Sequence, residues 1–338
     1  MIFAGNTTDF YRKGMSLLGA RALVGDVFMT TTLIISIIST AVIYAATVLY
    51  AAVGEIFSQR AGIMNLGLEG IMLMGAVSGY MVAVYKQNLI LAMIVVVLVG
   101  AVLGLVFSFL TITMQADQTV SGMAILTFGT GLSGFLGKPV SGVNAELAFE
   151  PVAIPLLSRI PVLGPSLFNQ NILVYLMYAI IPLSMIYIYK TRAGMILRAL
   201  GENPAALDSA GYNVFALRYA YVTFGSIMTA VSGAVVSLAY TNFWSDGMTS
   251  GKGWIAVALV VFSAWNPLTA TFGALLFGAI SIIGIDVQTV FPHVPSQVFS
   301  ALPYVATIIA LIFTTGNFRG RRSAAPAALT IPYDRETR

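Results

Sequence analysis

Residues 88–114 read NLILAMIVVVLVGAVLGLVFSFLTITM, and none of these side chains is charged. An α-helix rises about 1.5 Å per residue, so a run of this length can cross the roughly 30 Å hydrocarbon core of a bilayer. Strands of an outer-membrane barrel show a weak alternation over about ten residues instead of a continuous apolar run. The stretch therefore predicts a membrane-spanning helix.

The rest of the chain has the same character. Hydrophobic residues make up 58% of its 338 residues and charged residues only 9%, and the mean hydropathy is +0.89. A soluble domain is about a quarter charged. The chain lacks the charges that would coat a water-exposed surface, so we expect the bilayer to surround most of it.

Uncharged or nearly uncharged runs recur and predict about nine transmembrane helices. They cover 30–53, 61–85, 88–114, 119–137, 171–189, 219–241, 253–264, 268–285 and 298–316. The last part of 253–285 is separated from the first at Asn266–Pro267, because proline cannot donate to the helix ladder and asparagine favours turns. We therefore expect an all-α integral membrane protein with broken segments.

Basic residues predict which loops face the cytoplasm. The loop 190–218 and the tail 317–338 are both rich in Lys and Arg, and the positive-inside rule places both in the cytoplasm. Four predicted spans separate the loop from the tail, and an even number of spans returns the chain to the same side of the membrane. We divide the chain into an N-terminal segment (1–29), a transmembrane domain (30–316) and a cytoplasmic tail (317–338). The tail has no apolar period and predicts disorder.

The N-terminus is harder to place. Counting back through five spans puts it outside, which conflicts with Arg12, Lys13 and Arg21. Either the rule fails here or residues 14–29 hold an additional interfacial or spanning helix.

The loop 190–218 contains a short helix with clear start and stop signals. Asn203 can cap it, Pro204 suits its first turn, and Gly211 can adopt the left-handed conformation after its end. A helix of about seven residues is unstable alone, so it must dock on the chain's own span ends or on a partner. Two interpretations of the loop remain: it only connects two spans, or it couples the membrane domain to a cytoplasmic partner that supplies energy.

The stretch 54–76 is the other unusual region. Asn65, Gly67, Glu69 and Gly70 interrupt an otherwise apolar run. Unwound backbone and a carboxylate at membrane depth mark a pathway or a buried pair, which makes Asn65 and Glu69 candidates for the translocation path. Alternatively, residues 54–70 lie at the cytoplasmic interface and Glu69 begins a helix, where its charge suits the helix dipole.

A weak internal echo adds two candidates. Gly-x4-Gly-Ala occurs at 70–76 and at 273–279, each time after an asparagine, Asn65 or Asn266. Interrupted spans in corresponding halves are typical of transporter repeats with the solute route between them, so a pseudo-repeat of two halves is an expectation and Asn266 a candidate. Trp244 suits an aromatic belt at the external border or a contact with a solute ring.

Several classes of function are excluded. The chain has no cysteine and a single histidine, His293, in a loop-like stretch, so we expect no metal and no cofactor. The match to GxGxxG at 129–134 lies inside an apolar span, and no Walker A motif is present. The chain is therefore not an enzyme, and its net charge of +4 indicates biased loops and not nucleic-acid binding. The pairs Gly75/Gly79 and Gly100/Gly104 predict close helix packing.

Three stretches resemble one family. The sequence GENPAALDSAGYNV (201–214) resembles the cytoplasmic coupling loop of ABC importer permeases of the branched-chain amino acid/ribose permease family. The stretches GEIFSQRAGIMNLGLEGIMLMGA (54–76) and GWIAVALVVFSAWNPLTATFGALLFGA (253–279) are similar to the subgroup that imports nucleosides or simple sugars. The resemblance covers roughly residues 30–316.

The resemblance implies a permease subunit of the bacterial plasma (inner) membrane that moves a small polar solute inward by alternating access. Its partners would be an ABC ATPase subunit, a second related permease and an extracytoplasmic substrate-binding lipoprotein. By matching position, the ATPase contacts would be Gly201, Glu202, Asn203, Pro204, Ala205, Ala206 and Gly211. An ion-coupled secondary transporter or a channel is the alternative, and it would need intramembrane acids such as Glu69 or Asp286.

Overall fold

The computed structural model describes residues 7–291, 293–316 and 325–335. Almost all regular structure within these ranges is helical. The α-helices are α1 (Thr7–Arg60), α2 (Leu68–Lys86), α3 (Leu89–Ser108), α4 (Gln118–Gly137), α5 (Leu163–Leu167), α6 (Ile172–Lys190), α7 (Arg192–Glu202), α8 (Pro204–Ser209), α9 (Val214–Val235), α10 (Lys252–Phe262), α11 (Pro267–Val290) and α12 (Ser296–Gly316). The prediction of an all-α integral membrane protein is confirmed.

Short helical turns and one two-stranded ribbon lie between or at the ends of the long helices. Helices α3 and α9 each continue into a π-helical turn, η1 (Phe109–Thr113) and η4 (Val236–Tyr240). The long loop between α4 and α6 holds two 3-10 turns, η2 (Lys138–Val140) and η3 (Leu157–Arg159). It also holds a two-stranded antiparallel ribbon of β1 (Val152–Ala153) and β2 (Asn169–Gln170).

Seven helices in the described part of the chain are long and apolar enough to cross a bilayer. They are the predicted spans that begin at residues 30, 61, 88, 119, 171, 219 and 268. The predicted count of nine is not confirmed. Helix α10 has only 11 residues, which at about 1.5 Å per residue reaches only about half-way across the hydrocarbon core. Helix α12 does not count among the seven.

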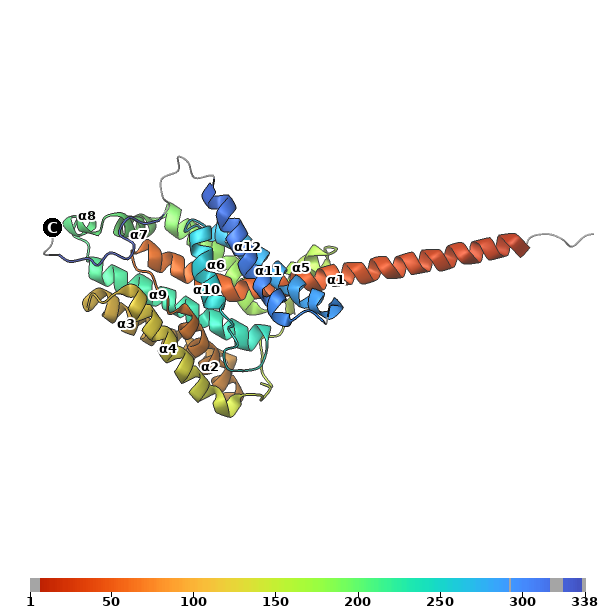
Figure 1. Ribbon diagram of the computed structural model, residues 1–338, viewed down its shortest axis with the longest axis horizontal. Coiled ribbons are helices and arrows are strands. Elements are labelled where there is room, and N and C mark those ends of the chain that lie inside the picture. The colour runs from red at the N-terminus through yellow and green to blue at the C-terminus, as the bar shows by residue number, and fades with distance from the viewer. Residues whose placement is uncertain (1–6, 292, 317–324, 336–338) are drawn as a thin grey trace, which may run out of the picture.

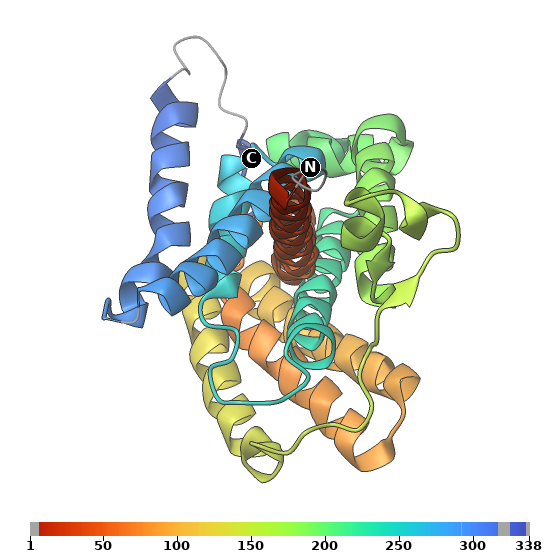
Figure 2. The ribbon, with the colours of Figure 1, turned by 90° about the vertical axis from the view of Figure 1, so that its right-hand side faces the viewer.

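Helices α1 and α9 form the centre of the bundle. Helix α1 packs on α9, α10 and α11, and α9 also packs on α2 and α3. Figure 2 looks along α1 and shows the other helices arranged around it. The N-terminal part of α1 extends beyond the bundle in Figure 1, and residues 14–29 belong to this same continuous helix.

Glycines allow the central helices to approach closely, as predicted. A Cβ on Gly75 of α2 would lie 2.1 Å from the carbonyl oxygen of Ala230 in α9. Gly100 and Gly104 of α3 face residues 223–230 of α9 in the same way. Such contacts replace a hydrophobic driving force that lipid does not supply. The first glycine of the rejected GxGxxG match, Gly129, packs against the backbone of Gly70 and is a helix-packing residue.

The prediction of a disordered tail is wrong for residues 325–335, which we call the C-terminal segment. The amide of Ala328 donates to the carbonyl of Gly201 (2.8 Å), and the amide of Thr330 donates to the carbonyl of Gly62 (3.1 Å). Tyr333 is buried at its end of the bundle. The segment has no helical or strand period because it is held by scattered backbone contacts. The rest of the tail's prediction lies outside the described residues.

Candidate functional site

The predicted short helix exists as α8, six residues long. The side-chain oxygen of Asn203 accepts a hydrogen bond from the amide of Ala206 (3.0 Å), and Pro204 occupies the first turn. After the helix, Gly211 has φ +89°. Its amide donates to the carbonyl of Asp208 (2.9 Å) and the amide of Tyr212 donates to the carbonyl of Leu207 (3.3 Å), which is a Schellman ending. Local sequence signals therefore define both ends of α8.

The predicted ATPase contacts differ in exposure. Glu202, Asn203, Ala206 and Gly211 are exposed, and Pro204 and Ala205 are partly buried. Gly201 is buried against the end of α1, where a Cβ would lie 2.2 Å from the carbonyl oxygen of Arg60. All of these residues except Gly201 thus lie where a second protein can reach them in this conformation.

The C-terminal segment connects α8 to the bundle. Arg335 forms an ion pair with Asp208 of α8 at 2.7 Å, and the hydrogen bond with that carboxylate raises the pKa of Arg335 above its ordinary value. The ring of Tyr333 packs 5.9 Å from that of Phe215 and 6.0 Å from the guanidinium of Arg218. A groove of about 380 Å³ lies between residues 202–205 and 327–334. We call this part of the bundle the α8 end (Figure 1).

Glu69 lies where two helices begin inside the bundle. It occupies the first turn of α2 and is only 9% exposed. Its carboxylate accepts hydrogen bonds from the Thr249 hydroxyl (2.5 Å) and from the amides of Gly251 (2.8 Å) and Gly253 (2.7 Å) at the start of α10. The carboxylate thus satisfies the free amides of one helix start and the dipoles of two. Glu69 begins a helix, as one interpretation predicted, but it does so next to a second helix start.

A second buried carboxylate, Glu55 in α1, was not predicted from the sequence. One of its oxygens accepts hydrogen bonds from the Gln59 amide group and from the backbone of Asn65, both at 2.9 Å. The Gln59 oxygen in turn accepts from the indole N–H of Trp265 (2.7 Å). This network joins the end of α1 to the unwound residues 61–67 and to the turn before α11. The signal in the sequence is the i, i+4 spacing of Glu55 and Gln59, which places them on one helix face.

The remaining predicted residues have structural contacts. The Asn65 side chain accepts from the amide of Gly67 (2.8 Å), which shapes the unwound stretch before α2. Asn266 caps α11 by accepting from the amides of Leu268 (2.9 Å) and Thr269 (3.4 Å). Trp244 is 1% exposed, and its indole lies directly against Gly137 at the end of α4. Among the described residues, neither Asn266 nor Trp244 forms a hydrogen bond with the Glu69 carboxylate, whose partners are Thr249, Gly251 and Gly253.

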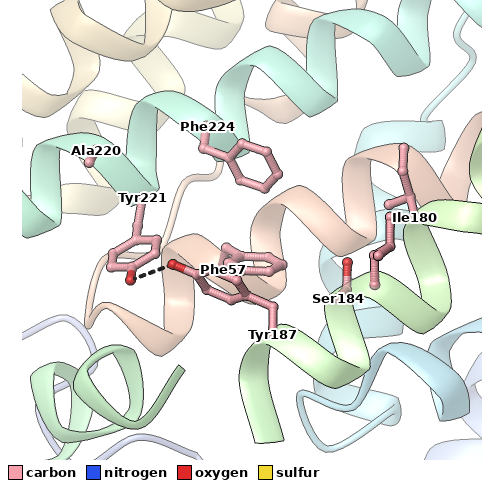
Figure 3. A pocket seen from close by; sticks show the side chains of 8 residues that line it. Phe57, Ile180, Ser184, Tyr187, Ala220, Tyr221 and Phe224 are labelled. Atoms are coloured by element: carbon pink, nitrogen blue, oxygen red, sulfur yellow. Dashed lines mark hydrogen bonds between the residues drawn. The ribbon is translucent and has the colours of Figure 1, made fainter. Parts of the chain in front are cut away.

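An apolar cavity of about 440 Å³ lies between α1, α6 and α9. Figure 3 shows Phe57 between the two tyrosines of this cavity and Phe224, with ring centroids 5.5 Å from Tyr187 and 5.1 Å from Phe224. The hydroxyl groups of Tyr187 and Tyr221 lie 3.0 Å apart and bond to each other. Few polar groups remain for a solute here.

A second cavity, of about 270 Å³, lies at the start of α10 near Glu69. Its lining includes Lys252, a buried lysine that the sequence reasoning did not single out. The available signal was a single basic residue between two glycines, Gly251 and Gly253, immediately before an apolar run.

Comparison with known proteins places the chain among transport permeases. Residues 37–311 match the family described as branched-chain amino acid transport system/permease component. A putative glucose ABC transporter permease of Haloferax volcanii is 35% identical over 88% of this chain and 97% of its own length. A nucleoside ABC transporter permease of Lactococcus lactis is 33% identical, over 88% and 96% respectively.

A guanosine ABC transporter permease of Bacillus subtilis is likewise 33% identical over 88% of this chain and 96% of its own. No solved structure matches the chain significantly.

Proposed function

Because the chain belongs to the branched-chain amino acid transport system permease family, we propose that it carries a nucleoside or simple sugar inward as the membrane subunit of an ATP-driven importer. The solute class is that named for the three relatives, which transport glucose, nucleosides or guanosine. Family membership and the seven apolar helices also confirm the predicted location, a multi-pass protein of the bacterial inner membrane.

The chain is a transport subunit, and ATP hydrolysis belongs to a separate ATPase that docks on α8. The observation that carries this proposal is the geometry of α8. It is capped at both ends and exposed at Glu202, Asn203 and Ala206. Gly201 packs against the end of α1 and bonds to the C-terminal segment, and Asp208 pairs with that segment. A force applied to α8 is therefore transmitted through these contacts to the end of α1 and to the C-terminal segment.

Alternating access would follow from two packings of the bundle that the partners bias. The ATPase acts at the α8 end, which the basic loop places in the cytoplasm. An extracytoplasmic binding protein delivers the solute at the opposite end, and a second, related permease completes the pathway. The intramembrane Glu69 already accepts three hydrogen bonds, which supports a structural role over the ion site that a secondary transporter needs.

The test is uptake by the complete importer in proteoliposomes with ATP inside and the binding protein outside. Replacing residues 204–209 by a glycine–serine linker should abolish ATP-dependent uptake and release the ATPase from the purified complex. Val152→Arg, on the exposed ribbon of the long loop, is the matched control and should change neither. Normal ATP-dependent uptake by the linker variant would contradict the proposal. Arrest of uptake by a protonophore at constant ATP would favour the ion-coupled alternative.

A further inference from the structure

The second cavity has a lining suited to a small polar solute. It is enclosed by α1, α10, α11 and α12, and its side chains include three tyrosines, a lysine and an amide: Tyr44, Tyr240, Tyr304, Lys252 and Gln288. Aromatic faces with a few placed polar groups are the usual composition of a small-molecule site.

Lys252 is the unusual member of this lining. It is only 7% exposed, and its ammonium donates one hydrogen bond, to the carbonyl of Thr249 (3.3 Å). The ammonium also lies 5.1 Å from the ring centroid of Tyr44 and 5.9 Å from that of Tyr240. An ammonium has three donors, and burying it without partners is costly. Among the described residues, two of its donors have no hydrogen-bond acceptor and are left for a guest in the cavity.

Glu69 balances this charge from the other side of a turn. Residues 249–253 separate the two groups, and the carboxylate binds Thr249, Gly251 and Gly253 of that turn. The two opposite charges therefore balance each other locally. A cation entering it would meet the ammonium, and an anion would leave a net negative charge buried beside Glu69. A neutral guest avoids both penalties.

The cavity lies away from the α8 end. Helix α10 ends near Trp265, whose carbonyl accepts hydrogen bonds from Arg60 at the end of α1 (2.8 and 3.0 Å). Lys252 is at the other end of α10, 10 residues from Phe262, or about 15 Å along the helix. Gln288 lies in the last turns of α11, which starts beside the same Trp265. A solute arriving from the side opposite α8 thus meets the cavity at the start of α10, before it reaches the far end of that helix.

We propose that this cavity is a solute-binding station on the transport path, and that it accepts neutral ring compounds with hydroxyl or carbonyl oxygens. The tyrosine rings would stack on the sugar or base, and Lys252 and the Tyr240 hydroxyl would donate to its oxygens. The Tyr304 hydroxyl already donates to the carbonyl of Ser250 (3.3 Å). Sugars and nucleosides share this chemistry. The proposal rests on the proposed function.

The first test uses transport. In proteoliposomes with the full importer, uptake of labelled D-glucose and guanosine is measured for the native chain and for Lys252→Met. Loss of a hydrogen bond from a charged donor should lower uptake by about 10- to 100-fold, while ATPase assembly on α8 is unchanged. Lys86→Met, at the exposed end of α2, is the control and should transport normally. Normal uptake by Lys252→Met would contradict the proposal that this cavity binds the solute.

The second test needs no ATP and separates the cavity from the coupling. Since the chain has no cysteine, Ser250→Cys places a single thiol at the cavity wall, and its alkylation is followed by mass on this chain. D-glucose or guanosine should slow alkylation of Ser250→Cys and leave the exposed Tyr85→Cys unaffected. Protection lost in Lys252→Met would support the assignment even if ATP-dependent uptake failed. Protection by glucose 6-phosphate or guanosine monophosphate alone, or by none of the four, would overturn it.

Discussion

The guanidinium of Arg335 holds the carboxylate of Asp208 with two hydrogen bonds, Nε to Oδ2 at 3.0 Å and Nη2 to Oδ1 at 2.7 Å. These residues are 127 positions apart in the chain. The pair is bidentate, which adds geometric definition to the charge. It joins the end of the C-terminal segment to α8, the element proposed to receive the ATPase, so the segment is positioned to stabilise that helix.

Arg335→Gln should loosen the C-terminal segment and leave the bundle folded. The guanidinium side of this pair is 67% exposed, so solvent screens it and the effect is local. Amide hydrogen exchange at Ala328 and Thr330 should become faster, because both amides donate hydrogen bonds from this segment to the bundle.

The pair raises the pKa of Arg335, so the arginine stays charged at neutral and alkaline pH. High salt should therefore reproduce the faster exchange, while a mildly alkaline pH should not. Unchanged exchange in Arg335→Gln would contradict this role; Arg192→Gln, at the exposed start of α7, is the control.

The contrast between α8 and the C-terminal segment shows what the sequence could predict. The ends of α8 depend on residues within a few positions of one another, Asn203, Pro204 and Gly211, whose cap and turn chemistry is local. The same holds for the break at Asn266–Pro267. The position of the C-terminal segment depends on partners such as Gly62 and Asp208 that are far away in the chain and have no pattern pointing to them. Its disorder was therefore predicted wrongly.

The interior site was predictable only in part. The polar interruption around Glu69 was visible as a departure from an apolar run, but its partners at Thr249–Gly253 are about 180 residues later. Lys252 gave little signal alone, since a lysine before an apolar helix usually lies at a membrane border. Its burial follows from the shortness of α10, which starts inside the bundle. Hydropathy shows that a segment is apolar, but it does not show how deep within the membrane the helix begins.

Removing the Glu69 carboxylate should destabilise the protein. Glu69→Ala leaves the buried amides of Gly251 and Gly253 without acceptors, at about 1–3 kcal/mol for each unsatisfied group. Glu69→Gln keeps one acceptor and should lose less. Thermal unfolding in detergent is monitored by size-exclusion chromatography. The Tm should be highest for the native protein, lower for Glu69→Gln and lowest for Glu69→Ala. Glu146→Gln, at an exposed loop position, is the control. An Ala variant as stable as the native protein would show that water replaces the carboxylate.

Gly75→Ala should separate α2 from α9. The new Cβ would lie 2.1 Å from the Ala230 carbonyl oxygen, so the two backbones must move apart. Overpacking of this kind costs about 1–3 kcal/mol. Gly131→Ala is a matched control in α4, because no atom lies within 4 Å of its Cβ, and helix propensity there favours alanine by about 1 kcal/mol. The Tm should fall for the first variant and hold or rise for the second; equal melting would argue that α2 and α9 are not packed through Gly75.

Gly211→Ala should weaken attachment of the ATPase without a steric clash. No atom lies within 4 Å of a Cβ at this position, so the only penalty is the φ of +89°, which an L-residue adopts at a cost of about 1–2 kcal/mol. That strain is relieved if the last turn of α8 unwinds, which would move the exposed surface that the ATPase is proposed to bind. Gly211→Asn should retain more attachment, since asparagine tolerates the left-handed region.

Gly142 also has a left-handed φ, +76°, and open space around its Cβ, but it belongs to the long loop between α4 and α6. Gly142→Ala thus carries the same backbone strain far from α8 in the chain. Copurification of the ATPase should fall for Gly211→Ala alone; an equal fall for both would mean that general destabilisation, and not α8, controls attachment.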